Sequence, residues 1–293
     1  MSALTPSHLT TAQAGLLDGL VERLRRIDGI AAIVLGGSHA GGHALPTSDL
    51  DVGLYYQPNA PIDIAALAAA VTALNDTPRP DLVTPLGGWG PWINGGGWLR
   101  IQGQAVDLLY RDLDRVAQVC EACASGQVEM AYQPGHPHGF VSPIYAGEIA
   151  VCRPLWDPDG AVAALKARVL PYPLALQRAL LDKFGWEMSF ALETARKPAA
   201  RGEVSYVAGC CFRCVACLMQ VLFALNKEYL LNEKGAVRRA DSLPLRPPRL
   251  AERIHSAFAH LASPADAAAA LDKLGGLVAE VDRLRAEHGP EAG

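Results

Sequence analysis

The sequence lacks a strong excess of charge of either sign, and this lack narrows the set of partners. Its 293 residues carry 26 Lys and Arg against 30 Asp and Glu, which gives a formal net charge of -4. Such a balance gives no reason to expect charge-driven binding to nucleic acid or to an anionic membrane. A small-molecule partner therefore fits best, a protein partner stays open, and the sequence says nothing about the oligomeric state.

Long apolar runs and the pattern of a secretory signal are also missing. No uninterrupted apolar stretch of about 18 residues occurs, and Met1 is not followed by the cationic start and apolar core of a secretory signal. We therefore expect a cytoplasmic protein without a membrane segment.

Cysteines are present, but their pattern argues against a disulfide framework or a zinc site. The seven thiols in so long a chain are typical of a reduced protein, and no second Cys or His pair stands at zinc spacing from Cys120 and Cys123. The segment 210–217, CCFRCVAC, has a spacing that also binds iron-sulfur clusters. We favour a buried helix with positions 210, 214 and 217 on its core face, because no turn residue follows Gly209.

The remaining pattern predicts an α/β (α+β) chain: a small mixed-sheet domain followed by an all-α bundle. Apolar periods and turn residues predict, in order, a helix at 11–29, strands at 30–35 and 50–56, a helix at 62–76, a glycine- and tryptophan-rich loop at 87–98, and a hairpin of strands 97–101 and 105–111. We assign residues 1–115 to the sheet domain, 116–172 to connecting helices and a loop, and 173–293 to the helical domain.

Three aspartates stand where apolar strands are expected. Asp49 and Asp51 are two residues apart, so a strand would present both on one face. Asp107 lies inside another apolar run, where a carboxylate is costly unless it is paired or bound to a metal. Hard oxygen ligands select Mg²⁺, with Mn²⁺ as the alternative. We therefore expect the three acids to converge on two metal ions about 4 Å apart, which is an arrangement suited to phosphoryl displacement.

The loop before the first two acids suits a phosphate. Gly36 and Gly37 allow the backbone to approach a ligand, and Ser38 adds a hydroxyl and an N–H group. If the chain turns helical there, the N–H groups point at an anion. His39 could touch the same phosphate, although a packing role is the commoner one.

These residues carry a family resemblance. The stretch LGGSHAGGHALPTSDLDVGL resembles the signature of the nucleotidyltransferase superfamily, which includes DNA polymerase beta and the aminoglycoside and lincosamide nucleotidyltransferases. In that family an apolar residue and Gly-Gly or Gly-Ser precede an acid, an apolar residue and a second acid. Ten residues separate Ser38 from Asp49 here, which fits the spacing. The resemblance implies that Gly37 and Ser38 contact phosphates and that Asp49 and Asp51 bind metal ions.

The resemblance extends to a third acid with one departure. Asp107 stands where aminoglycoside-modifying members carry a glutamate that takes the proton from the acceptor hydroxyl. Those members also append a helical domain in which an arginine and a later lysine touch the triphosphate. Arg213 and Lys234 stand in similar places. Two alternatives stay open: a pairing of Arg213 with a buried glutamate, and a solvated turn at Lys234.

Together these features predict a metal-dependent nucleotidyltransferase. It would use ATP to transfer AMP to an acceptor hydroxyl, in a small molecule resembling an aminoglycoside or in a protein, and would release pyrophosphate. The alternative from another class is a regulatory or antitoxin-like protein that binds nucleotide without turnover. Two weaker motifs remain: His136 and His138 could bind a metal, and Arg249 with His255 matches the spacing of certain helical RNases.

Overall fold

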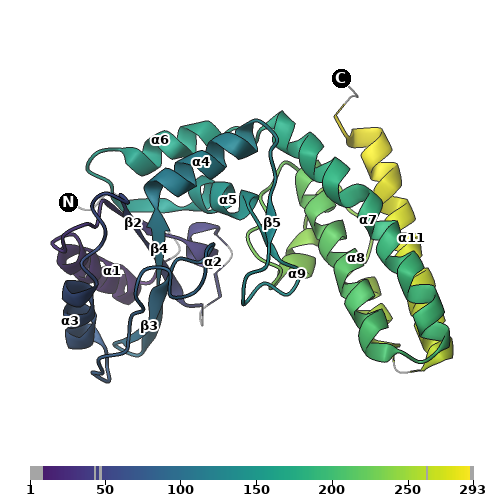
Figure 1. The fold of residues 1–293 in the computed structure, drawn as a ribbon, viewed down its shortest axis with the longest axis horizontal. Helices are drawn as coiled ribbons and strands as arrows, with labels where there is room; N and C mark the ends of the chain where they lie inside the picture. Colours follow the sequence, from purple (N-terminus) through teal and green to yellow (C-terminus); the bar gives the residue numbers. More distant parts are fainter. Residues whose placement is uncertain (1–8, 43, 46–47, 262, 291–293) are drawn as a thin grey trace. The chain divides into compact units, whose positions relative to one another are not determined.

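The computed structural model describes residues 9–42, 44–45, 48–261 and 263–290. The chain divides into two compact units. The first holds residues 1–121, 132–135 and 145–171, and the second holds residues 122–131, 136–144 and 172–293. The elements of each are labelled in Figure 1.

A five-stranded sheet forms the centre of the first unit. Its strands lie in the order β3 (Gly96–Ile101), β4 (Gln104–Asp112), β2 (Leu50–Tyr56), β1 (Ala32–Leu35) and β7 (Arg153–Trp156). The β2 and β4 strands run parallel, and the other neighbours are antiparallel. This mixed sheet, with helices following it, confirms the expected fold class. The sequence did not predict β7, which pairs with β1.

The expected hairpin joins β3 to β4. Gln102 and Gly103 have φ values of 54° and 79°, the left-handed pair that a tight two-residue hairpin turn requires. Asp76 fixes this turn, because its carboxylate accepts hydrogen bonds from both backbone N–H groups at 2.7 and 2.8 Å. The prediction of a loop over residues 87–98 was partly wrong: β3 already begins at Gly96.

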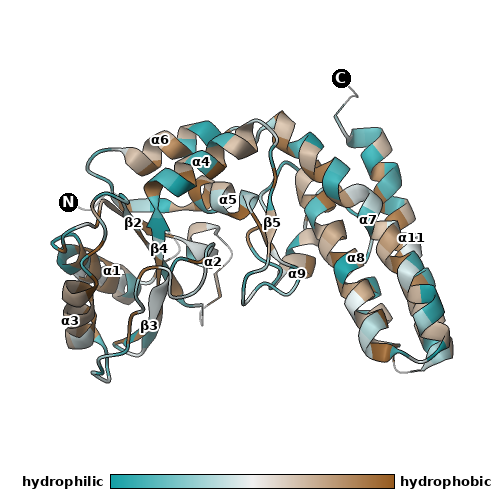
Figure 2. Cartoon of the chain, in the orientation of Figure 1, coloured by the Kyte–Doolittle hydropathy of each residue, from teal (hydrophilic) through white to brown (hydrophobic). Residues whose placement is uncertain are grey.

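Two helices cover one face of the sheet. The α1 helix (Thr11–Leu24) begins at a capping box formed by Thr10 and Gln13, and α3 (Ile64–Leu74) begins at the Asp63 cap. They lie side by side (Figure 1). The hydrophobic colouring of α3 runs almost throughout the helix, and its buried residues join the sheet core (Figure 2). The α1 helix ends before the predicted Gly29, because the chain turns at Arg25 and buries Ile27 and Ile30.

Further short elements follow the sheet. They are α4 (Leu113–Ala124), β5 (Met130–Ala131), β6 (Phe140–Val141), α5 (Pro143–Val151) and α6 (Ala161–Val169). The sequence predicted α4 and α6 and treated residues 132–143 as an interruption. The β5–β6 pair and α5 were missed.

The second unit is built on long helices. They are α7 (Leu174–Ala200), α8 (Val204–Leu225), α9 (Ala236–Ala240), α10 (Leu250–Ala259) and α11 (Pro264–His288). The α7, α8 and α11 helices pack against one another (Figure 1). By length and composition alone α8 could cross a membrane, yet 72% of its apolar window is buried inside the protein. Such burial is typical of the central helix of a bundle.

The cysteines of α8 are part of this packing. Cys211, Cys214 and Cys217 are buried, whereas Cys210 is half-buried, so the predicted core face was wrong by one position. Burial raises the pKa of the Cys211 thiol to about 11 and raises those of Cys214 and Cys217 further. Because metal ligation needs thiolates on flexible backbone, these protonated thiols in a continuous helix favour the packing role.

Candidate functional site

The turn between β1 and β2 places glycine against an acid. Gly36 caps the short helix α2 (Gly37–Ala40), and its N–H donates to the Asp51 carbonyl oxygen at 2.8 Å. Gly37 has a φ of 56°, and a Cβ at this position would lie 1.7 Å from Asp51 Oδ2. The Asp51 carboxylate therefore packs on the Gly37 backbone, and only glycine leaves room for it.

The rest of this turn holds Ser38 and His39, whose contact with phosphate stays a prediction. Ser38 is half-buried in the first turn of α2, where its N–H lies at a helix start. His39 is only 3% exposed, and its Nε2 lies 3.4 Å from the Ser48 carbonyl oxygen, so the ring ties α2 to the start of β2. His43, Pro46 and Thr47 of the same loop lie outside the described residues.

Two of the three predicted acids face each other across neighbouring strands. Asp51 on β2 is the register partner of Asp107 on β4. Neighbouring strands lie about 4.8 Å apart, and register partners point to the same face of a sheet. Both side chains are half-buried. The structure thus brings together two acids that are far apart in the sequence.

Asp49 is placed differently. It lies just before β2, which begins at Leu50, and it is exposed. Asp49 therefore lies one residue outside the strand that was expected to carry both acids. Within the described ranges, no three His, Cys, Asp or Glu side chains are close enough to hold a metal ion together. The structure thus aligns Asp51 with Asp107, and the part of Asp49 in a metal site stays a prediction.

The donor set of this pair still fits a divalent cation. Two carboxylates at adjacent positions repel each other unless a positive charge lies between them. Their oxygens are the ligands that Mg²⁺ and Mn²⁺ prefer. The Gly37 contact holds one of the two carboxylates in place without adding any charge. The arrangement is thus suited to holding a cation beside a bound phosphate.

A tryptophan lies next to these acids, and the sequence did not show its position. Trp98 on β3 is the register partner of Asp107 on β4. Trp98, Asp107 and Asp51 therefore form a row on one face of three adjacent strands. The glycine-rich composition before β3 was visible in the sequence, but only strand register shows which tryptophan faces the acids.

The predicted triphosphate contacts lie in the second unit. Arg213 on α8 pairs with Glu187 on α7, whose side chain is 13% exposed, so the alternative of a glutamate partner is the one present. Cys217 Sγ also lies 3.6 Å from Glu187. Lys234 is exposed in the turn before α9, where its backbone N–H donates to Asn232. Nucleotide contact by Arg213 and Lys234 stays a prediction.

The two histidines of the GHPHG segment surround a glutamate of the same unit. His136 Nδ1 lies 3.2 Å from Glu233 Oε2, and the backbone N–H of His138 donates to Glu233 at 2.8 Å. The contacts with His136 and His138 lower the pKa of Glu233 although burial alone would raise it. Burial and the Arg213 charge lower the pKa of His138. This cluster forms a structural contact between the β6 hairpin and the α9 turn.

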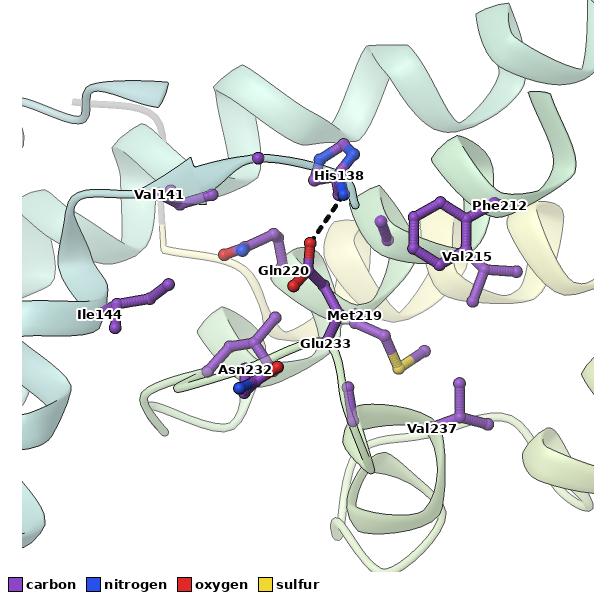
Figure 3. Close-up of a pocket in the computed structure, with 14 residues that line it drawn as sticks. His138, Val141, Ile144, Phe212, Val215, Met219, Gln220, Asn232, Glu233 and Val237 are labelled. Carbon is purple, nitrogen blue, oxygen red and sulfur yellow. Dashed lines mark hydrogen bonds between the residues drawn. The ribbon is translucent and has the colours of Figure 1, made fainter. Parts of the chain in front are cut away.

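A small cavity lies beside this cluster (Figure 3). Its volume is about 50 Å³. The lining is mainly apolar, from Phe212, Val215 and Met219 of α8 and from Val237, with Gln220 and Glu233 as polar members. It has room for a few waters or a small apolar group.

The two residues of the weak RNase motif lie at the start of α10 and along it. Arg249 forms an exposed pair with Glu252 at the start of α10, and His255 is exposed on that helix. Neither side chain lies in a described pocket.

Comparisons with known proteins bear on the first unit. Residues 17–88 match the family model described as "Nucleotidyltransferase domain". No curated protein matches the chain. Among solved structures, a nucleotidyltransferase-like protein from Exiguobacterium sibiricum 255-15 is similar over 96% of this chain and 77% of its own, at 10% identity and a TM-score of 0.40.

The sequence match coincides with the turn described above. It includes α2 and β2, hence Gly37, Ser38, Asp49 and Asp51, and it ends before Asp107. The resemblance drawn from the glycine and aspartate spacing is confirmed at the level of this domain. The chain carries a nucleotidyltransferase domain at residues 17–88.

Proposed function

We propose that this protein transfers AMP from ATP to a hydroxyl group of a small-molecule acceptor in the cytoplasm, with pyrophosphate as the second product. The observation that carries the proposal is the in-register pair of Asp51 and Asp107, with the first acid seated on Gly37. Asp51 and the glycine turn before it lie within the residues that match the nucleotidyltransferase domain model, which supports the proposal. A divalent cation, Mg²⁺ or Mn²⁺, would neutralise charge on the phosphates when bound.

Each residue has a defined task in this reaction. The N–H groups of Gly37 and Ser38 bind phosphate oxygens, and Asp51 and Asp107, with Asp49 as a further ligand, would hold the cation. The acceptor oxygen attacks the α-phosphorus, and the bond from this phosphorus to the bridging oxygen of pyrophosphate breaks. The hydroxyl proton passes to Asp107. Arg213 and Lys234 are proposed to bind the triphosphate, for which Arg213 must exchange its Glu187 partner.

The test is pyrophosphate release from ATP with a panel of hydroxyl acceptors. Asp51→Asn keeps the side-chain shape and removes the charge, so we expect release to fall at least a hundredfold, or about 2.7 kcal/mol. Asp81→Asn is the matched control, since Asp81 is exposed and pairs with Arg79. Nucleotide binding that ignores Mg²⁺, with no turnover on any acceptor, would contradict the proposal and favour a regulatory nucleotide-binding protein. Turnover on proteins alone would make the chain a protein adenylyltransferase.

A further inference from the structure

Two tryptophans form a stacked pair at the edge strand of the first unit. The ring centroids of Trp89 and Trp98 lie 4.5 Å apart with an interplanar angle of 26°. Gly96 leaves room for the Trp89 ring, because a Cβ at this position would come within 2.9 Å of it. Trp89 therefore backs one face of Trp98, which is nevertheless 63% exposed.

The third tryptophan of this segment, Trp92, has a packing role and serves as a comparison for Trp98. Trp92 is 5% exposed, its ring lies edge-on to Tyr145, and the Arg115 guanidinium lies 4.4 Å from the ring centroid. Hydrophobic burial accounts for Trp92. It does not account for Trp98, because a large aromatic ring held rigid and left in solvent gains little from folding.

The position of Trp98 gives it a role in the proposed reaction. Trp98 is the register partner of Asp107, which is the register partner of Asp51. Cβ atoms of such partners lie about 5 Å apart. A ring lying flat on Trp98 would thus present its substituents to the carboxylate that is proposed to take the acceptor proton.

We propose that Trp98, backed by Trp89, is the binding platform for the acceptor, and that the acceptor is a small molecule whose reactive hydroxyl sits on a ring. The inference rests on the proposed function and names the substrate class of the same site. Tryptophan faces attract both aromatic rings and the C–H faces of saturated rings, because the face of the indole is electron-rich. An acyclic alcohol offers no such surface.

The experiment measures ring binding without nucleotide, by saturation-transfer NMR on the full chain. The probes are methyl β-D-glucopyranoside, 4-methylphenol and glycerol. We expect transfer to at least one ring compound and none to glycerol. Trp98→Ala should weaken ring binding about five- to a hundredfold, the range for loss of an aromatic stacking partner, and Trp98→Phe should retain most of it. Trp186→Ala is the matched control, since Trp186 is 59% exposed and packs against Phe190 in the second unit.

The outcomes separate this inference from the proposed function. Transfer to the glucoside alone assigns a saturated ring, and transfer to the phenol alone assigns an aromatic one. Equal transfer to glycerol, no transfer to either ring, or unchanged transfer in Trp98→Ala would overturn the inference. In turnover with an accepted ring alcohol, Trp98→Ala should raise the KM for the acceptor and leave that for ATP unchanged. Ring binding that depends on Trp98, without any pyrophosphate release, would overturn the proposed function and leave the ring site standing.

Discussion

The two ends of one face of β4 carry charge in opposite ways. At one end Asp107 lies opposite Asp51, so like charges are neighbours. At the other end Arg111, which is 3% exposed, donates to both carboxylate oxygens of Glu148 on α5 at 2.7 Å. Burial alone would lower the pKa of Arg111, but Glu148 outweighs it and raises that pKa. At the first position like charges lie on adjacent strands, and at the second opposite charges are paired.

This difference distinguishes charged residues that serve a reaction from charged residues that stabilise the sheet. A buried opposite-charge pair with two hydrogen bonds is satisfied within the fold, so removing one member leaves a buried charge. Two neighbouring carboxylates of like charge repel each other, and a bound divalent cation would relieve this repulsion. Removing a charge should therefore harm stability at the Arg111 end and activity at the Asp107 end.

The largest effect is expected at the acid end. Asp107→Asn keeps the shape and removes one of the two like charges, so nucleotidyl transfer should fall about a thousandfold or more, because both proton transfer and cation binding are lost. The free energy of unfolding without metal should stay the same or rise. Pyrophosphate release and urea unfolding measure the two quantities.

Asp18→Asn serves as the control, because Asp18 is an exposed acid of α1 in the same unit. It should leave transfer unchanged. A clear loss of stability in Asp107→Asn would break the comparison, since the acid would then be serving the fold.

The next effect is expected at the arginine end. Glu148→Ala leaves Arg111 buried without its carboxylate, which should lower the free energy of unfolding by about 3–5 kcal/mol. Glu22→Ala is the matched control: Glu22 and Arg25 also lie 2.7 Å apart, but both are exposed, so the loss should stay below about 1 kcal/mol. Urea unfolding measures both. Similar losses in the two variants would mean that burial does not distinguish these pairs.

A smaller effect concerns the glycine under Asp51. Gly37→Ala would push a Cβ to 1.7 Å from Asp51 Oδ2, at a φ of 56°. The carboxylate must move, and such a displacement of a catalytic group reduces the rate about a hundredfold. Gly36→Ala is the neighbouring control, because its Cβ would meet only Asp51 atoms at 3.7 and 3.8 Å. Equal activity in both variants would show that the position of Asp51 is not fixed by Gly37.

Much of this sheet could be predicted because its signals are local. The wholly apolar β1, the run of β2 and the glycine turn of the hairpin each fall within a few residues. Missed elements depend on distant partners. Residues Arg153–Trp156 include Pro154, all four are only half-buried, and they become β7 only by pairing with β1.

The site also has features that local sequence predicts and features that depend on distant contacts. The spacing of Ser38, Asp49 and Asp51 predicted a site in the sequence itself. Asp107 was predicted as a member of it because an acid in an apolar run is costly unless it is paired or bound to a metal. The register that sets Trp98 beside Asp107, the seat of Asp51 on Gly37 and the Glu187 partner of Arg213 are contacts between segments far apart in the chain. No pattern along one segment encodes them.

The smallest effect extends the comparison to the second unit, where like charges meet at His138 and Arg213. Burial, and then the Arg213 charge, lower the pKa of His138, so this like-charge conflict is relieved by loss of a proton. Unfolded histidine titrates near 6.5 and takes up the proton first. Stability is therefore complete above about pH 6.5 and falls as the pH drops toward the folded pKa, by at most about 1.4 kcal/mol per pH unit.

Thermal unfolding at pH 7 and pH 5 measures this slope. His138→Asn should reduce it, and His255→Asn should not, since His255 is exposed on α10. Glu233 acts in the same direction, but its pKa is lowered from about 4.5, so its contribution is lost only at more acidic pH. An unchanged slope in His138→Asn would show that the second unit does not relieve its like-charge contact by deprotonation. The comparison would then fail, because it sets deprotonation of His138 in the second unit beside cation binding by Asp51 and Asp107 in the first.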